Sequence, residues 1–211
     1  MIKSLVLAFF LSVSMSIIAQ TPTDYLPKEF HQERREMLRQ KMPVNSVAVV
    51  FSNPLRNRAN DVDYVFHQDP NFYYLTGFRE PNAVLVLFSD DQTDAEGNSY
   101  NDVLYVPKKD PRSEMWNGKR LGVDGVKSLL GFKRVKPAEN FISDDLNFKE
   151  FSKVFIEKFH NDYRNSESSN GDLYDLVSNF KQKSGYDPTV FLTSTKKRVY
   201  ELIRATPVEN S

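Results

Sequence analysis

The stretch RANDVDYVFHQDPNFYYLTGFREPNA (residues 58–83) is followed at once by the apolar run VLVLF (84–88), and this pairing decides the fold class. Its 26 positions hold six aromatic residues, four acids and two arginines. The run at 84–88 is continuous, apolar and rich in valine and leucine, as is typical of a strand buried on both faces. A polar, aromatic-rich segment that leads into a buried strand predicts an ordered surface patch rather than a filler loop.

A second polar run, DPRSEMWNGKRLG (110–122), follows after a further strand pattern and carries the only tryptophan, Trp116. In this order the two runs resemble the R-x-x-D…Y…Q…F-x-Y-x-T-G-F-x-E-P and E-x-W-x-G-x-R-L-G signatures of the N-terminal, non-catalytic domain of aminopeptidase P (Xaa-Pro aminopeptidase). The resemblance spans most of residues 28–209. It implies an α/β domain, a mixed β-sheet flanked by helices as in the creatinase and aminopeptidase P N-terminal domains.

Composition excludes several classes of function. The 211 residues are 40% hydrophobic and 27% charged, which are globular values. Lys and Arg together number 28, as do Asp and Glu, so no positive field favours nucleic acid as a partner. The chain has no cysteine, which rules out disulfides, thiolate nucleophiles and cysteine-based zinc sites.

The first twenty residues are typical of a secretory signal peptide. A positive Met1-Ile2-Lys3 head precedes an apolar run over 5–18 and then Ala19-Gln20. A membrane anchor is the alternative, but a spanning helix needs roughly 20 apolar residues. We therefore expect cleavage after Ala19 or Gln20, a secreted or periplasmic protein, and no membrane contact after cleavage. No cysteine follows, so lipid attachment is not expected.

The remaining pattern alternates between helix and strand signals, which predicts a mixed α/β domain with helices packed on a sheet. The expected helices cover 27–42, 123–130, 137–151, 173–183 and 194–205. The expected strands cover 46–51, 72–76, 83–88, 102–106 and 154–159. Residues 160–172 lack an apolar anchor except Tyr163, which predicts a surface loop.

The chemistry that the family performs has no counterpart in these residues. The resemblance implies that a C-terminal "pita-bread" domain holds two divalent metal ions, manganese by expectation, with two Asp, two Glu and one His. Here the three histidines, His31, His67 and His160, lie near no glycine-rich run, and no G-x-S-x-G turn or phosphate loop is present. We therefore expect no cofactor and no catalytic or metal-binding residue in this chain.

The expected organisation has three parts. Residues 1–20 are the signal peptide, 21–193 the aminopeptidase P N-terminal domain, and 194–211 an interdomain helix and linker. The segment VYELIRATPVEN (199–210) resembles a degraded form of the family's interdomain link, so the sequence is expected to stop where the catalytic domain would begin.

Trp116 and Arg120 are the candidate substrate-binding residues. A single indole in a polar, loop-like run is a poor core residue and a good interface anchor. The resemblance implies that Trp116 lines a substrate pocket, that of a neighbouring subunit, while Gly118 allows a close turn and Arg120 pairs with an acid that fixes it. Arg58, Asp61 and Asp63 are expected to tie their loop to the sheet by charged hydrogen bonds, with a polar clamp on a partner surface as the alternative.

Two functional hypotheses remain open at this point. In the first, the chain is the accessory domain of a secreted Xaa-Pro aminopeptidase-like metallopeptidase, with a peptide substrate and homo-oligomer contacts in the full-length enzyme. In the second, it is a stand-alone, non-enzymatic module that binds a peptide or protein. A creatinase- or prolidase-type domain is a weaker third, because the E-M-W-N-G-K-R-L-G run favours aminopeptidase P.

Overall fold

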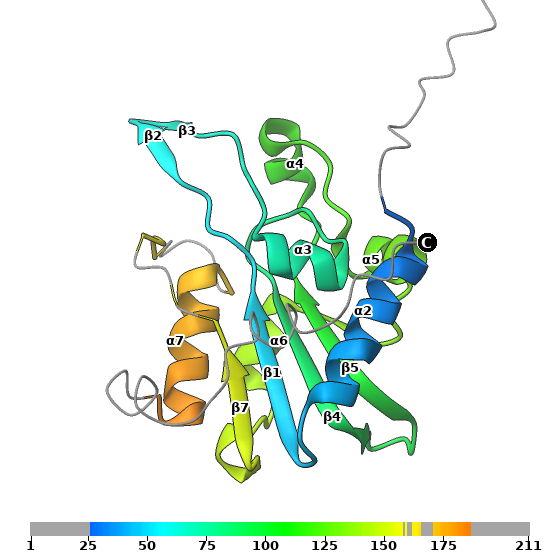
Figure 1. The fold of residues 1–211 in the computed structure, drawn as a ribbon. Coiled ribbons are helices and arrows are strands. Elements are labelled where there is room, and N and C mark those ends of the chain that lie inside the picture. The colour runs from blue at the N-terminus through cyan, green and yellow to red at the C-terminus, as the bar shows by residue number, and fades with distance from the viewer. Residues whose placement is uncertain (1–25, 158, 160–161, 166–170, 187–211) are drawn as a thin grey trace, which may run out of the picture.

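A five-stranded mixed sheet forms the centre of the computed structural model, which describes residues 26–157, 159, 162–165 and 171–186 (Figure 1). The strand order is β6-β5-β4-β1-β7. The inner pairs β1–β4 and β4–β5 are antiparallel, whereas the outer pairs β1–β7 and β5–β6 are parallel. The strands are β1 (Ser46–Phe51), β4 (Val84–Thr93), β5 (Ser99–Val106), β6 (Val135–Pro137) and β7 (Lys153–Ile156). The mixed sheet confirms the predicted fold class.

Side chains of the central strands alternate between two hydrophobic cores, one on each face of the sheet. In β1, Ala48 and Val50 pack on one face, and Val47 and Val49 on the other. Because both faces are buried, β1 and the first half of β4 read as continuous apolar runs. The sequence therefore located both strands.

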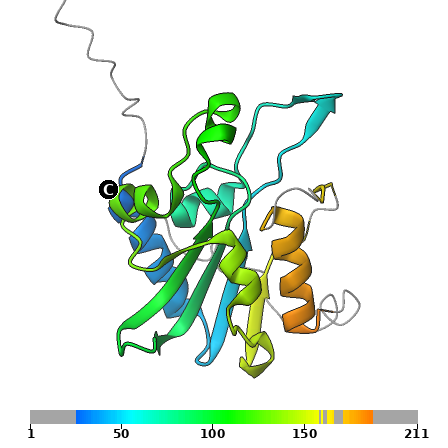
Figure 2. The same ribbon diagram turned by 180° about the vertical axis from the view of Figure 1, so that it is seen from behind.

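Helices cover both faces of this sheet (Figures 1 and 2). One face carries α2 (Lys28–Lys41), α3 (Pro70–Thr76) and α5 (Gly122–Leu130), and the other carries α6 (Ala138–Ser143), the 3₁₀ turn η1 (Phe148–Glu150) and α7 (Leu173–Ser184). On the second face, the rings of Phe141, Phe148 and Phe180 form a cluster in which Phe148 packs edge-to-face on Phe180 and tilted on Phe141. None of the helices in the described part of the chain is long and apolar enough to cross a membrane.

The predicted strand at 72–76 is wrong, because this segment is the helix α3. The Asp69 carboxylate caps it by accepting hydrogen bonds from the backbone N–H groups of Asn71 and Phe72, at 2.9 and 2.8 Å. Pro70 suits the first turn, and Gly77 ends the helix in the left-handed region with φ of 70°. Capping residues at both ends outweigh the strand preference of the aromatic run between them.

The predicted helix at 137–151 is interrupted. It leaves helical geometry at Asp144, whose backbone is extended, and resumes only as η1. The Asp144 carboxylate accepts a hydrogen bond from the Tyr105 hydroxyl at 2.7 Å, and Phe148 then returns to the core. The predicted helix is therefore interrupted at Asp144, because this residue is hydrogen-bonded to Tyr105 of β5.

Two short elements project beyond one end of the sheet (Figure 1). One is a ribbon of β2 (Asn57–Ala59) and β3 (Val62–Asp63), and the other is the helix α4 (Pro111–Asn117). The expected signal peptide at 1–20 and the expected helix at 194–205 lie outside the described residues, as does most of the expected loop at 160–172.

Candidate functional site

The run predicted to be a loop around Trp116 is the helix α4, seven residues long. Asp110 caps its first turn: the carboxylate accepts hydrogen bonds from the Arg112 N–H at 3.1 Å and the Ser113 hydroxyl at 2.6 Å. Pro111 takes the first helical position, and Gly118 ends the helix with φ of 77°. The Asp-Pro pair at one end and glycine at the other were the sequence signals for this helix.

Met115 and Trp116 stand out from the end of α4 into solvent. The exposed fractions are 77% for Met115 and 88% for Trp116. A large indole with this exposure belongs to no core. Adjacent exposed apolar side chains at the tip of a projecting helix form a surface suited to contact with another molecule. That Trp116 and Arg120 bind a peptide substrate stays a prediction.

A buried glutamate holds the turn that follows α4. Glu80 is 9% exposed, and its Oε1 accepts a hydrogen bond from the Leu121 N–H at 2.8 Å. The pKa of Glu80 is raised above its ordinary value, chiefly by burial and in small part by the charge of Glu114. The Leu121 hydrogen bond and the charges of Arg120 and Lys109 act in the opposite direction. Arg120 therefore lies near an acid, as expected, but the hydrogen bond to this acid that fixes the turn comes from the backbone of Leu121.

The loop before α3 is tied to the sheet by Gln68 rather than by Arg58, Asp61 or Asp63. The Gln68 amide accepts a hydrogen bond from the Asn53 N–H at 2.9 Å and donates to the carbonyls of Phe78 and Glu80 at 3.2 and 2.9 Å. The three charged residues are exposed on the β2–β3 ribbon. Among them, only Asp63 is hydrogen-bonded within the described part of the chain, to the Asn57 side chain of the same ribbon. The predicted charged ties are wrong.

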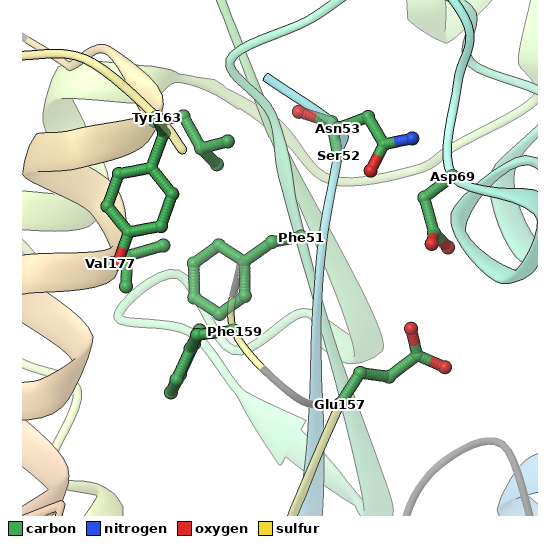
Figure 3. Close-up of a pocket in the computed structure, with 9 residues that line it drawn as sticks. Phe51, Ser52, Asn53, Asp69, Glu157, Phe159, Tyr163 and Val177 are labelled. Atoms are coloured by element: carbon green, nitrogen blue, oxygen red, sulfur yellow. The ribbon is translucent and has the colours of Figure 1, made fainter. Parts of the chain in front are cut away.

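A small pocket lies at the carboxyl ends of the parallel strands β1 and β7 (Figure 3). Figure 3 shows the carboxylates of Asp69 and Glu157 on one side of the end of β1, and the rings of Phe51, Phe159 and Tyr163 on the other. The cavity volume is about 30 Å³, far below the roughly 300 Å³ at which ligand pockets begin. This pocket is too small to take a peptide.

Glu157 is the titrating group of this pocket. Burial and the nearby Asp69 charge raise its pKa to about 7, against a hydrogen bond from the Asn71 amide to its Oε1 at 2.6 Å. The folded state therefore binds the Glu157 proton more tightly than the unfolded state does. The stabilisation of the fold by this bound proton is fully present below pH 4.5, the ordinary pKa of glutamate. It is lost as pH rises through about 7, the pKa of Glu157 in the folded protein.

The free energy of unfolding of Glu157→Gln is compared with that of the wild type at pH 5 and at pH 8. We expect the difference to favour the variant by about 1–2 kcal/mol more at pH 8 than at pH 5, because only the wild type must lose the proton. The figure is below the full value of the pKa shift because Glu157 stays partly exposed. Urea unfolding at the two pH values measures the difference. Glu96→Gln, in an exposed turn, is the matched control and should show no such pH dependence. An equal effect of Glu157→Gln at both pH values would contradict the assignment.

No group of three or more His, Cys, Asp or Glu side chains that could hold a metal ion is found in the part of the chain that the structure describes. The family described as "Aminopeptidase P, N-terminal domain" matches residues 31–149, from α2 to η1.

The chain belongs to the aminopeptidase P N-terminal domain family. Its curated relatives include Xaa-Pro aminopeptidase 3 of Mus musculus, 46% identical over 95 residues, and Xaa-Pro aminopeptidase of Haemophilus influenzae, 39% identical over 116 residues. These matches cover 44% and 55% of this chain, but only 18% and 26% of the relatives. This aminopeptidase P N-terminal domain thus corresponds to about a fifth to a quarter of the proteins it resembles.

Solved structures agree with the family assignment. Aminopeptidase P from Escherichia coli, solved with the inhibitor Pro-Leu, superposes with a TM-score of 0.57 at 26% identity over 75% of this chain and 33% of that one. Aminopeptidase PepP of Pseudomonas aeruginosa gives a TM-score of 0.55 at 32% identity over 62% of this chain and 28% of that one. The similarity to the Escherichia coli structure includes more of this chain than the family match at 31–149.

Glu80 and Glu114 are the residues of this aminopeptidase P N-terminal domain that sequence reasoning left without a role. Glu80 stands between Phe78 and Ala83, which are fully buried. Its neighbours in the sequence are Arg79 and Pro81, so the available signal was only its place four residues before the buried strand β4. Glu114 carried no signal, because an acid on a short helix is usually a solvated surface residue.

Proposed function

We propose that this domain is the N-terminal accessory part of a secreted Xaa-Pro aminopeptidase-like metallopeptidase, in which it shapes substrate access and makes oligomer contacts. In this proposal a C-terminal partner domain holds the pair of divalent metal ions, manganese by expectation, and removes the N-terminal residue that precedes proline. The described residues of this chain offer no cluster that fits such metals, so no reaction step is assigned to them.

The observation that carries the proposal is the exposure of Trp116 at the tip of α4. An indole gives a large apolar area with few rotamers to lose, which suits stacking against the flat ring of a proline-containing peptide. The solved Escherichia coli relative was captured with Pro-Leu, a dipeptide of that chemical class. In the proposed site Trp116 supplies this contact across to a neighbouring subunit, and Arg120 helps to hold the turn beside it.

The β2–β3 ribbon supports the oligomer part of the proposal. Val62 on this ribbon and the following Tyr64 and Val65 are 53%, 58% and 81% exposed. The ribbon and α4 project from the same end of the sheet (Figure 1). Apolar side chains on two neighbouring arms are suited to burial against a second subunit.

The proposed export rests on the signal-like residues 1–20.

A stand-alone binding module is the second candidate function. It is favoured by the same exposed pair, Met115 and Trp116, because this surface needs no catalytic partner to bind a peptide. Under this proposal the chain alone should bind proline-containing peptides with measurable affinity, whereas an accessory domain should contact them only beside the catalytic half.

Fusion of this chain to the metallopeptidase half of an Xaa-Pro aminopeptidase separates these functions. The fusion is expected to release the N-terminal residue from an Xaa-Pro peptide in a manganese-dependent reaction, and the unfused chain is expected to release none, because two bridged metal ions need several convergent carboxylates and a histidine. Mass spectrometry of the peptide measures both. Metal-dependent release by the unfused chain would contradict the proposal, and tight peptide binding by it would favour the binding module.

A further inference from the structure

The two projecting arms, the β2–β3 ribbon and α4, are held at their bases rather than along their length. Residues 57–65 of the ribbon are exposed except for the half-buried Asn57, and Glu114 alone is half-buried among the α4 side chains that the structure describes. Few buried apolar contacts leave a segment with little stability of its own, and a seven-residue helix has few internal hydrogen bonds. The direction in which each arm points therefore depends on the contacts at its base.

The base of the ribbon is held by the side-chain amide of Gln68, which uses all four of its hydrogen-bonding positions. Its Oε1 accepts from the backbone N–H groups of Asn53, where the chain enters the ribbon, and Asp69, where it leaves, both at 2.9 Å. Its Nε2 donates to the carbonyls of Phe78 and Glu80, at 3.2 and 2.9 Å. An amide has two N–H donors and two acceptor sites, whereas an ionised carboxylate of the same size has no donor. Only an amide therefore suits both sets of partners.

The base of α4 is held by the side chain of Glu80, the residue whose backbone carbonyl binds Gln68. Its Oε1 accepts a hydrogen bond from the Leu121 N–H at 2.8 Å, in the turn that follows Gly118 at the end of α4. Its Oε2 is buried and has no hydrogen-bond partner among the described residues, so the burial of this carboxyl costs stability. Glu80 therefore fixes the turn after α4 rather than strengthening the core.

The short segment 78–80 that makes these contacts is itself anchored in the core. Phe78 is fully buried, and its ring packs edge-to-face on that of Phe72, with ring centroids 6.4 Å apart. A path of hydrogen bonds thus runs from the base of the ribbon through Gln68 and Glu80 to the base of α4. We call this path the Gln68–Glu80 bridge.

We propose that Gln68 and Glu80 are positioning residues for Trp116, and that the Gln68–Glu80 bridge holds the two arms as one binding surface. Neither residue touches the substrate in this arrangement, because each acts through the backbone that it holds. The importance of the bridge for catalysis rests on the proposed function, in which Trp116 contacts the peptide, but the coupling between the arms does not. A change at the base of the ribbon should therefore alter the mobility of Trp116 on the other arm.

The steady-state fluorescence anisotropy of Trp116, the only tryptophan, measures this coupling in the whole chain. Gln68→Glu keeps the size of the side chain and an acceptor for the Asn53 N–H but removes both donors. We expect a lower anisotropy than in the wild type, although residue 68 lies at the base of the other arm. Glu80→Met removes the acceptor for Leu121 and should lower the anisotropy as well. Glu80→Gln keeps a side-chain oxygen for Leu121 and should give the wild-type value.

Peptide kinetics and a matched control complete the experiment. In the fusion with a catalytic half, Gln68→Glu and Glu80→Met are expected to lower kcat/KM for an Xaa-Pro peptide about 10-fold, because the indole is misplaced rather than removed. Phe180→Leu is the control for a loss of stability alone. Phe180 is fully buried on the other face of the sheet, so this variant should unfold at a lower temperature with wild-type anisotropy and kinetics.

Three results would overturn the bridge: an unchanged anisotropy in Gln68→Glu, an equal fall in Phe180→Leu, or the same fall in Glu80→Gln as in Glu80→Met. Circular dichroism shows whether Gln68→Glu is folded, and Gln68→Met, which lacks the amide without adding a charge, decides the question if it is not. The expected anisotropies together with kinetics that ignore Trp116→Ala would refute the proposed function and leave the bridge standing.

Discussion

Asp102→Ala is expected to lower the free energy of unfolding by about 3–5 kcal/mol. The Asp102 carboxylate accepts a hydrogen bond from Nε of Arg35 at 2.6 Å, and the side chains are 14% and 5% exposed. Arg35 also donates to the Leu75 carbonyl at 2.8 Å and lies over the Phe132 ring. Removal of the acid leaves a buried guanidinium whose charge has lost its ion-pair partner, which costs far more than an exposed ion pair is worth.

Urea unfolding of matched variants measures this effect. Asp91→Ala breaks the exposed Arg39–Asp91 pair, in which Asp91 is 60% exposed, and should cost at most about 1 kcal/mol. The double change Arg35→Met with Asp102→Leu removes both charges and should recover most of the lost stability. A loss from Asp102→Ala no larger than that from Asp91→Ala would show that α2 is held by its apolar contacts alone.

The same ion pair shows where sequence reasoning reached its limit. The sequence pattern located α2, but it gave no sign that an arginine of this helix is buried. The structure buries His31, Arg35 and Leu38 as one face. A buried arginine is identified only by its partner, and Asp102 is 67 residues away in the sequence. Periodicity carries no information about such a pairing.

Local patterns were sufficient wherever burial is continuous or caps are strong. The apolar run of β1 was located with its bounds, and the helix expected at 123–130 ends where α5 ends, before Gly131. The aromatic run of α3 was assigned to a strand because its composition outweighed the Asp69-Pro70 start and the Gly77 stop. For the site, an indole in a polar run predicted exposure, but the hydrogen bond from the Leu121 N–H to Glu80 requires two distant segments to meet in space.

Trp116→Ala is expected to lower kcat/KM for an Xaa-Pro peptide about 10- to 100-fold in the fusion with a catalytic half. This corresponds to the loss of roughly 1.4–2.8 kcal/mol, the range of an aromatic hot spot. Stability should change by less than about 0.5 kcal/mol, because Trp116 is 88% exposed and fills no core. Leu129→Ala removes another large apolar side chain, 62% exposed on α5 and outside the two arms, and should leave both quantities unchanged.

The most direct test of the accessory-domain proposal is therefore the paired measurement of kcat/KM and thermal unfolding for wild type, Trp116→Ala and Leu129→Ala. We expect a fall in kcat/KM for Trp116→Ala alone, with the same unfolding temperature in all three proteins. Unchanged kinetics in Trp116→Ala, or a fall equal to that in Leu129→Ala, would contradict the proposal that α4 of this domain presents Trp116 to the substrate.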